Sequence, residues 1–368
     1  MDNNGSDYRE PNYGGGYYYG EPRWSDFTLD DEKRAKSRFS KFFLALFVFT
    51  LASNVAAMLI ETFILLAFGE AKALQIFDSY WYLWAMNIAV MYVIAFPVFY
   101  LIIRKMRTVN RYQSKILVLD FFALLMVGEA FMYLGSVVGT WLNSFFSIFV
   151  GEMPENTTSE LIMNSPIWIV IIVAVIIGPI VEELMFRKLM IDRLSVYGDK
   201  IAIIVSSIAF GIFHGNFYQF FYAALLGLVL GYVYTKTANI VYPIIMHMFI
   251  NFWGSIIPLL INKPMERYYE LAEQYAIGEA IDMTEFSRLT LIVGGYAAVQ
   301  LAMVIAGAVI FFKRRKRVFI SDRCEVTIPK QRRVAVILGN VGAILFLVIS
   351  GITMILNIIS PLFNAAAA

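Results

Sequence analysis

Residues 166–190 read PIWIVIIVAVIIGPIVEELMFRKLM, an apolar run that carries two adjacent acids and a base in its second half. About 20 apolar residues suffice for a helix to cross a membrane, so this run predicts a transmembrane helix. Ionisable groups are unfavourable at membrane depth and by default mark a functional site. Glu182, Glu183 and Arg187 are therefore the first candidates for such a site.

The rest of the chain has the same character. Apolar residues make up 59% of the 368 residues and charged residues only 16%, whereas soluble proteins carry about 25% charged residues. The mean hydropathy is +0.66. Since the apolar residues fall in blocks of about the length of a membrane span, we predict an all-α, polytopic transmembrane bundle. No glycine-rich phosphate loop or nucleic-acid motif is present, so the lipid bilayer and not a nucleic acid is the expected environment.

The apolar blocks predict eight or nine spans. The nine blocks are 42–68, 81–103, 116–150, 166–190, 201–215, 217–236, 240–261, 288–312 and 334–358. The third is too long for one straight span, so we expect its end near Trp141 to bend or to lie in the interface. Only Gly215 and Asn216 separate the fifth and sixth blocks, which predicts a tight turn or a break.

The charged residues predict the orientation. Lysines and arginines gather just before the first span and in the segments 104–115, 188–200 and 313–333, whereas the segments 152–160 and 266–285 are acidic. Basic loops stay on the cytoplasmic side of a membrane. We therefore expect an integral membrane protein with a cytoplasmic N-terminus, and with nine spans the C-terminus lies outside.

We divide the chain into five parts. They are a Tyr/Gly-rich, disordered tail with a basic end (1–41), two N-terminal spans (42–115), a helical core that contains the acids and both histidines (116–261), an acidic outer loop with two C-terminal spans (262–358), and a tail (359–368). The last four residues are alanines that look like an added cloning sequence, and we set them aside.

Two pairs of polar residues lie four positions apart in the apolar blocks. Glu183 and Arg187 share one helix face and can form an ion pair. His247 and Asn251 also share a face, and their imidazole and carboxamide offer two donors to one point, as an oxyanion requires. Glu182 is turned about 100° around the helix from Glu183. It has no obvious local partner and is free to act on a water molecule.

The remaining features complete a candidate reaction centre. His214 ends the sequence Phe210-Gly-Ile-Phe-His214, and it is the only other histidine in the chain. A carboxylate and a histidine on facing helices can hold and deprotonate a water molecule. Pro179 should kink its helix and free backbone carbonyl groups upstream of Glu182. Glu129 lies outside these motifs, and we expect it to pair within the bundle.

The order Glu-Glu-x-x-x-Arg, Phe-x-x-x-His and His-x-x-x-Asn on successive membrane helices resembles the CPBP family of CAAX-type prenyl proteases and bacteriocin-processing enzymes. The resemblance covers about residues 116–261. It implies an intramembrane glutamic endopeptidase with a polar cavity open to the cytosol, acting on a membrane-associated peptide or protein. It also implies the roles of the site residues: Glu182 as the base, His214 as the water holder, His247 and Asn251 as the oxyanion hole, and Glu183, Arg187 and Phe210 as supporting residues.

Two alternatives stay open. Two histidines and a glutamate could hold a catalytic zinc ion, although the His-Glu-x-x-His helix of zinc proteases is absent and Asn251 is a poor zinc ligand. We therefore favour an enzyme without a metal cofactor. The second alternative is a non-catalytic scaffold, a bacteriocin-immunity factor or a transporter, since polar residues at depth also line transport paths. No internal repeat of the transporter kind is visible.

Overall fold

The computed structural model describes residues 27–154, 156–318, 320 and 324–367, and every regular element in these ranges is a helix. The predicted all-α fold is thus confirmed. The disordered tail was predicted for a region whose residues 1–26 lie outside the described residues.

The helices follow one another with short connections. The N-terminal part contains α1 (Leu29–Phe68), α2 (Glu70–Phe77), α3 (Tyr80–Asn87), η1 (Ile88–Ala95), α4 (Phe96–Ile103) and α5 (Val118–Val150). The central part contains α6 (Thr157–Met163), α7 (Ile167–Val170), η2 (Ile171–Ile177), α8 (Gly178–Glu183), η3 (Leu184–Ile191), α9 (Asp192–Leu194), η4 (Ser195–Tyr197), α10 (Asp199–Phe213), α11 (Phe217–Thr237) and α12 (Val241–Asn251). The C-terminal part contains η5 (Phe252–Ile256), α13 (Ile257–Ala276), α14 (Met283–Arg314), η6 (Arg315–Arg317), η7 (Lys330–Arg332), α15 (Arg333–Ile337) and α16 (Val341–Ala367).

Eight helical runs of the described residues are long and apolar enough to cross a membrane, and the chain is an integral membrane protein. They are Leu29–Phe68, Tyr80–Ile103, Val118–Val150, Ile167–Tyr197, Phe217–Thr237, Val241–Ala276, Met283–Arg314 and Val341–Leu362. The fifth predicted block, 201–215, is not among them, because it forms α10, which has only 15 residues. At about 1.5 Å per residue, α10 is shorter than the roughly 30 Å hydrocarbon core.

The first span begins at Leu29, well before the predicted start at residue 42. The charged segment is helical because Thr28 and Asp31 form a capping box, in which each side chain bonds the backbone N–H of the other. Two ion pairs further stabilise this first part of α1, and each joins residues one helical turn apart: Asp30 with Arg34, and Glu32 with Lys36. The basic residues before the apolar block are therefore part of the helix.

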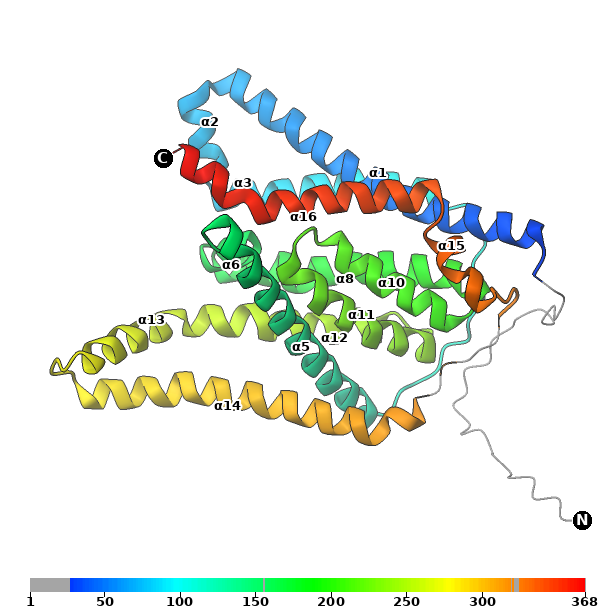
Figure 1. The fold of residues 1–368 in the computed structure, drawn as a ribbon. Coiled ribbons are helices and arrows are strands. Elements are labelled where there is room, and N and C mark those ends of the chain that lie inside the picture. The colour runs from blue at the N-terminus through cyan, green and yellow to red at the C-terminus, as the bar shows by residue number, and fades with distance from the viewer. Residues whose placement is uncertain (1–26, 155, 319, 321–323, 368) are drawn as a thin grey trace, which may run out of the picture.

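Other boundaries also differ from the sequence prediction. The run that carries the acids continues from residue 190 to Tyr197. The helix that begins at Val241 continues past residue 261 to Ala276, so that the first part of the predicted acidic loop is helical. The third span does not bend near Trp141, because α5 is one helix of 33 residues. In Figure 1, α5 crosses the bundle obliquely, which accommodates its length.

The charged loops gather at two opposite ends of the bundle (Figure 1). The basic end holds the start of α1 and the ends of α4 and α14, and the acidic end holds α6 and the turn between α13 and α14. The C-terminal end of α16 lies at the acidic end. Which end faces the cytoplasm stays a prediction from the charge distribution.

Small residues allow the central helices to pack closely. α5 lies along α11, α10 along α11, α14 along α5, and α1 along α16. A Cβ atom added at Gly135 of α5 would overlap the backbone of Tyr222 in α11, and one at Gly139 would lie 2.5 Å from the carbonyl oxygen of Phe217. Glycine at such contacts lets membrane helices approach backbone to backbone. This packing fixes α11 and, through it, the turn that carries His214.

Candidate active site

The helix with the two acids is locally widened. The short α8 lies between two π-helical segments, η2 before it and η3 after it, and π-bulges are frequent at functional sites. In η2 the N–H of Gly178 bonds the carbonyl of Val173, five residues back. In the same pattern, the carbonyl of Ala174 would accept a hydrogen bond from the backbone N–H of residue 179, but this residue is Pro179, which has no N–H. The predicted free carbonyl is present, and the Nδ2 of Asn251 donates to it at 2.8 Å.

Glu183 and Arg187 form the predicted ion pair at the centre of the site. The Nε of Arg187 lies 2.9 Å from the Oε2 of Glu183, and both side chains are completely buried. The Nη1 of Arg187 donates to the hydroxyl of Ser206 on α10 at 3.2 Å. The guanidinium group also lies over the ring of Phe210, 4.9 Å from its centroid. Phe210 thus supports the site by direct contact.

His247 links this ion pair to the second acid. Its Nδ1 lies 3.1 Å from the Oε1 of Glu183, and its Nε2 lies 3.6 Å from the Oε2 of Glu182. The ring is only 4% exposed, whereas the Glu182 side chain is 19% exposed. A carboxylate on one ring nitrogen fixes the orientation of an imidazole and leaves the other nitrogen for chemistry. Glu182 has no local partner on its own helix, as the sequence indicated, but it faces His247 from another helix.

His214 and His247 both contact the ring of Phe210. The Phe210 ring meets the His214 ring edge to face at 5.0 Å and the His247 ring at 5.8 Å. The residue after His214, Gly215, has a φ of 69°, a left-handed conformation that favours glycine. The predicted tight turn is present, and it holds His214 at the end of α10.

Glu182 and His214 lie at matching depth. The helical run of Glu182 ends at Tyr197 and α10 begins at Asp199, so each side chain is fifteen residues from this junction. At about 1.5 Å per residue, both lie roughly 22 Å from it along their helices. This matching depth requires the helix of Glu182 to continue past residue 190, where the sequence predicted that the fourth span ends.

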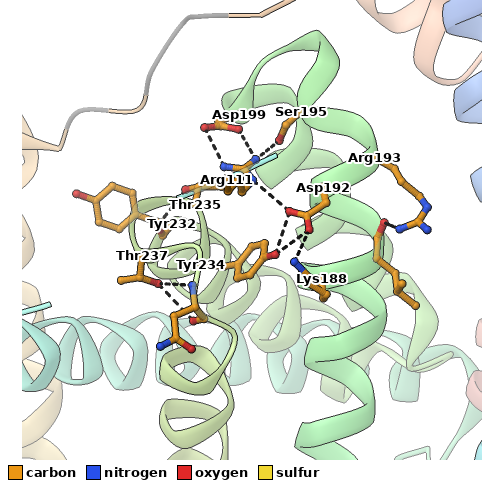
Figure 2. A network of polar contacts seen from close by, with 12 residues as sticks. Arg111, Lys188, Asp192, Arg193, Ser195, Asp199, Tyr232, Tyr234, Thr235 and Thr237 are labelled. Atoms are coloured by element: carbon orange, nitrogen blue, oxygen red, sulfur yellow. Dashed lines mark hydrogen bonds and ion pairs between the residues drawn. The ribbon is translucent and has the colours of Figure 1, made fainter. Parts of the chain in front are cut away.

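A buried polar network anchors the helices of the site at the basic end (Figure 2). Arg111, from the loop between α4 and α5, forms ion pairs with Asp192 at 3.1 Å and with Asp199 at 2.7 Å. The hydroxyl of Tyr234 on α11 donates to Asp192 at 2.9 Å, and Lys188 pairs with the same carboxylate at 2.9 Å. The network joins η3, α9, α10 and α11, and so fixes the base of the helices that carry Glu182 and His214.

Sequence reasoning missed several of these partners. Ser206 bonds both Arg187 and the carbonyl of Phe186. A signal was available, because Ser206, Phe210 and His214 follow one another at four-residue steps and share one face of α10. Arg111 gave no comparable signal, since it looks like any other cation of a basic loop.

Two further expectations concerned the partner of Glu129 and a possible zinc site. Glu129 is completely buried, and its carboxyl group interacts with the side chain of Gln300 on α14, although neither carboxylate oxygen has a well-formed hydrogen bond among the described residues. The described residues contain no group of three or more His, Cys, Asp or Glu side chains that could hold a metal ion. The catalytic cavity open to the cytosol stays a prediction.

The arrangement defines a class of protein: a helical membrane protein with paired carboxylates and a carboxylate-oriented histidine placed for acid–base chemistry inside the bundle. Residues 164–253, which include every predicted site residue, match the family model described as Type II CAAX prenyl endopeptidase Rce1-like. This part of the chain is therefore similar to an Rce1-like domain, and the resemblance seen in the motifs is confirmed.

Three relatives support this assignment. YdiL of Bacillus subtilis (strain 168), provisionally named a membrane peptidase, is 30% identical over 127 residues, which are 34% of this chain and 51% of YdiL. The membrane-embedded CAAX protease MroQ of Staphylococcus aureus (strain USA300) is 30% identical over 128 residues, 33% of this chain and 52% of MroQ. The UPF0177 protein YxdF of Lactococcus lactis subsp. lactis (strain IL1403) is 36% identical over 87 residues, 23% of this chain and 48% of YxdF. The chain thus spans about half the length of the curated relatives it matches, and no solved structure gives a significant match.

Proposed function

We propose that this protein is an intramembrane endopeptidase that hydrolyses a peptide bond of a membrane-associated peptide or protein with a water molecule activated by Glu182. The observation that carries the proposal is the chain of contacts from Arg187 through Glu183 to His247, which directs the free ring nitrogen of His247 at Glu182. The match of the same residues to an Rce1-like domain supports a peptidase.

The separation of the two reacting groups suits a bridging water. At 3.6 Å, the His247 Nε2 and the Glu182 Oε2 are too far apart for a direct hydrogen bond. A water molecule beside both atoms could give one proton to the carboxylate of Glu182 while His247 orients it. The partial exposure of Glu182, in contrast to the buried Glu183, leaves it the more accessible of the two acids.

The steps balance without a covalent intermediate. Glu182 takes a proton from water, the oxygen attacks the peptide carbonyl carbon, and the C–N bond breaks as the departing nitrogen receives that proton. Asn251 donates one of its two amide N–H groups to the carbonyl of Ala174, and the second remains for the oxyanion of the tetrahedral intermediate. We assign His247 to the water instead of the oxyanion hole that the resemblance implies, because its Nε2 lies beside Glu182. His214 is proposed as the second contact of the water, as the resemblance implies.

The test compares the wild-type protein with Glu182→Gln in the native host background. Peptide termini are mapped across the membrane and secreted fractions, with both proteins folded and at equal abundance. New termini that appear with the wild type and disappear with Glu182→Gln would establish the activity and name the substrate. Glu129→Gln is the matched control, because it changes another buried glutamate outside the motifs and should leave the termini unchanged.

Two results would contradict this proposal. Identical termini in wild type and Glu182→Gln would favour the non-catalytic alternatives, a scaffold or immunity factor. Stoichiometric zinc in the purified, active protein, with activity lost on chelation and restored by zinc, would favour the zinc-dependent version of the same protease.

A further inference from the structure

A basic groove lies at the basic end of the bundle, away from the candidate active site. The start of α1, the loop after α4, η4 and the segment 325–327 enclose a cavity of about 930 Å³. Its lining includes six cations: Lys33, Arg34, Arg38, Lys41, Lys105 and Arg107. Only two carboxylates, those of Asp31 and Glu325, line it as well. The groove therefore carries a large excess of positive charge.

Part of this charge holds the groove together. Arg38 donates to the carbonyl oxygens of Arg107 at 3.2 Å and of Arg193 at 2.9 Å. Arg107 pairs with Glu325 at 3.0 Å. The backbone N–H of Glu325 donates to the carbonyl of Val196 at 3.0 Å. These bonds connect the walls of the groove, so its shape is fixed by the fold.

The three lysines are different. Lys33, Lys41 and Lys105 are exposed, and among the described residues no ion pair or hydrogen bond involves their side chains. All three line the same cavity, and an anion bound there would be attracted by their positive charges. Lysine is a common ligand of phosphate groups in proteins.

The floor of the groove shows which phosphate compound fits. Apolar side chains, among them Phe27, Met106 and Val326, line the same cavity. Lys41 directly precedes the apolar block of α1, so we expect the groove to lie near the lipid headgroups. Apolar side chains do not favour the binding of a free phosphate ion, whereas they can contact the apolar chains that lie next to the phosphate of a phospholipid. Basic pockets between transmembrane helices are known to bind such headgroups.

We propose that the basic groove binds the headgroup of an anionic phospholipid, whose phosphate is held by Lys33, Lys41 and Lys105. The groove lies at the end of the bundle that the charge distribution predicts to face the cytoplasm, where anionic lipids are attracted to basic segments. A bound lipid would tie the start of α1 to the loop after α4. This inference does not depend on the proposed peptidase activity.

The experiment uses the full chain purified in a neutral detergent. Fluorescently labelled phosphatidylglycerol is titrated into the wild type, with phosphatidylcholine carrying the same label as the uncharged comparison. The groove variant combines Lys33→Gln, Lys41→Gln and Lys105→Gln. The control variant combines Lys115→Gln, Lys313→Gln and Lys316→Gln, three exposed lysines in segments predicted to lie on the same side of the membrane but outside the groove.

We expect the groove variant to bind phosphatidylglycerol at least ten-fold more weakly than wild type, and the control variant to change by less than two-fold. Replacing the same three groove lysines by arginine should retain binding, which separates loss of charge from loss of fold. An equal loss in both glutamine variants, or equal binding of the two lipids, would overturn the proposal. Displacement of the lipid by millimolar inorganic phosphate would also overturn it and show a small-anion site.

Discussion

Removal of the guanidinium group of Arg187 should strongly destabilise the protein. Arg187 and Glu183 are completely buried, and Arg187→Met leaves the Glu183 carboxylate with His247 as its remaining partner. Breaking a buried ion pair on one side costs about 3–5 kcal/mol, because the other charge stays buried without compensation. Glu183→Gln should lose a similar amount, since it leaves the guanidinium group in the same position.

The double variant distinguishes a true pair from two independent effects. Independent losses would sum to about 6–10 kcal/mol, but Glu183→Gln with Arg187→Met removes both charges and should lose only about 3 kcal/mol. The assay is unfolding in mixed micelles by titration with sodium dodecyl sulfate, followed by tryptophan fluorescence. Arg267→Met is the control. It breaks an exposed ion pair with Glu285 and should have little effect, because water and salt screen such pairs.

Additive losses in the two single variants and the double variant would refute this reasoning. So would a loss of less than about 1 kcal/mol for Arg187→Met, which is the range of exposed pairs. Either result would mean that water reaches the pair in the membrane, and that Glu183 does not depend on Arg187 to stay charged beside His247.

Three other predictions concern single positions. Pro179→Ala restores a backbone N–H that can compete for the carbonyl bound by Asn251, so cleavage should slow by about 10- to 100-fold while stability in the same titration does not fall. Gly135→Val should cost about 1–3 kcal/mol or more, because its side chain would overlap the backbone of α11, whereas Gly351→Ala, which meets no neighbour, should not. Glu129→Leu should leave stability unchanged or raise it by about 1–3 kcal/mol, because it removes a buried carboxyl group without a well-formed hydrogen bond among the described residues. A clear loss of stability would show that the interaction of this carboxyl with Gln300 stabilises the fold.

Much of the fold could be predicted from the sequence because a bilayer imposes a length on each apolar block. The eight long spans each match a predicted block, and the ion pair of Glu183 with Arg187 follows from one helical turn. The start of α1 could also have been found. Thr28 and Asp31, with charge pairs four residues apart, are ordinary signals of a helix start.

Other features could not be found in this way. Almost every residue in the run 167–181 is apolar, so apolar and polar positions do not alternate with any helical period. The sequence therefore cannot reveal that η2 has a π-helical hydrogen-bond pattern. Only Pro179 hinted at a change of hydrogen bonding. The contact of His247 with both acids joins residues more than sixty positions apart, and it depends on how α12 packs against α8. Spacing along one helix says nothing about that packing.

The geometry of the site suggests why a histidine faces Glu182. The His247 Nε2 lies 3.6 Å from the Glu182 Oε2, a separation that a water molecule beside both atoms would bridge. Without the imidazole, that water would lose the group that orients it towards the base. We therefore expect His247→Gln to abolish cleavage as completely as Glu182→Gln does, in a protein that remains folded, and partial activity of His247→Gln in the peptide-terminus assay would show that Glu182 activates water without it.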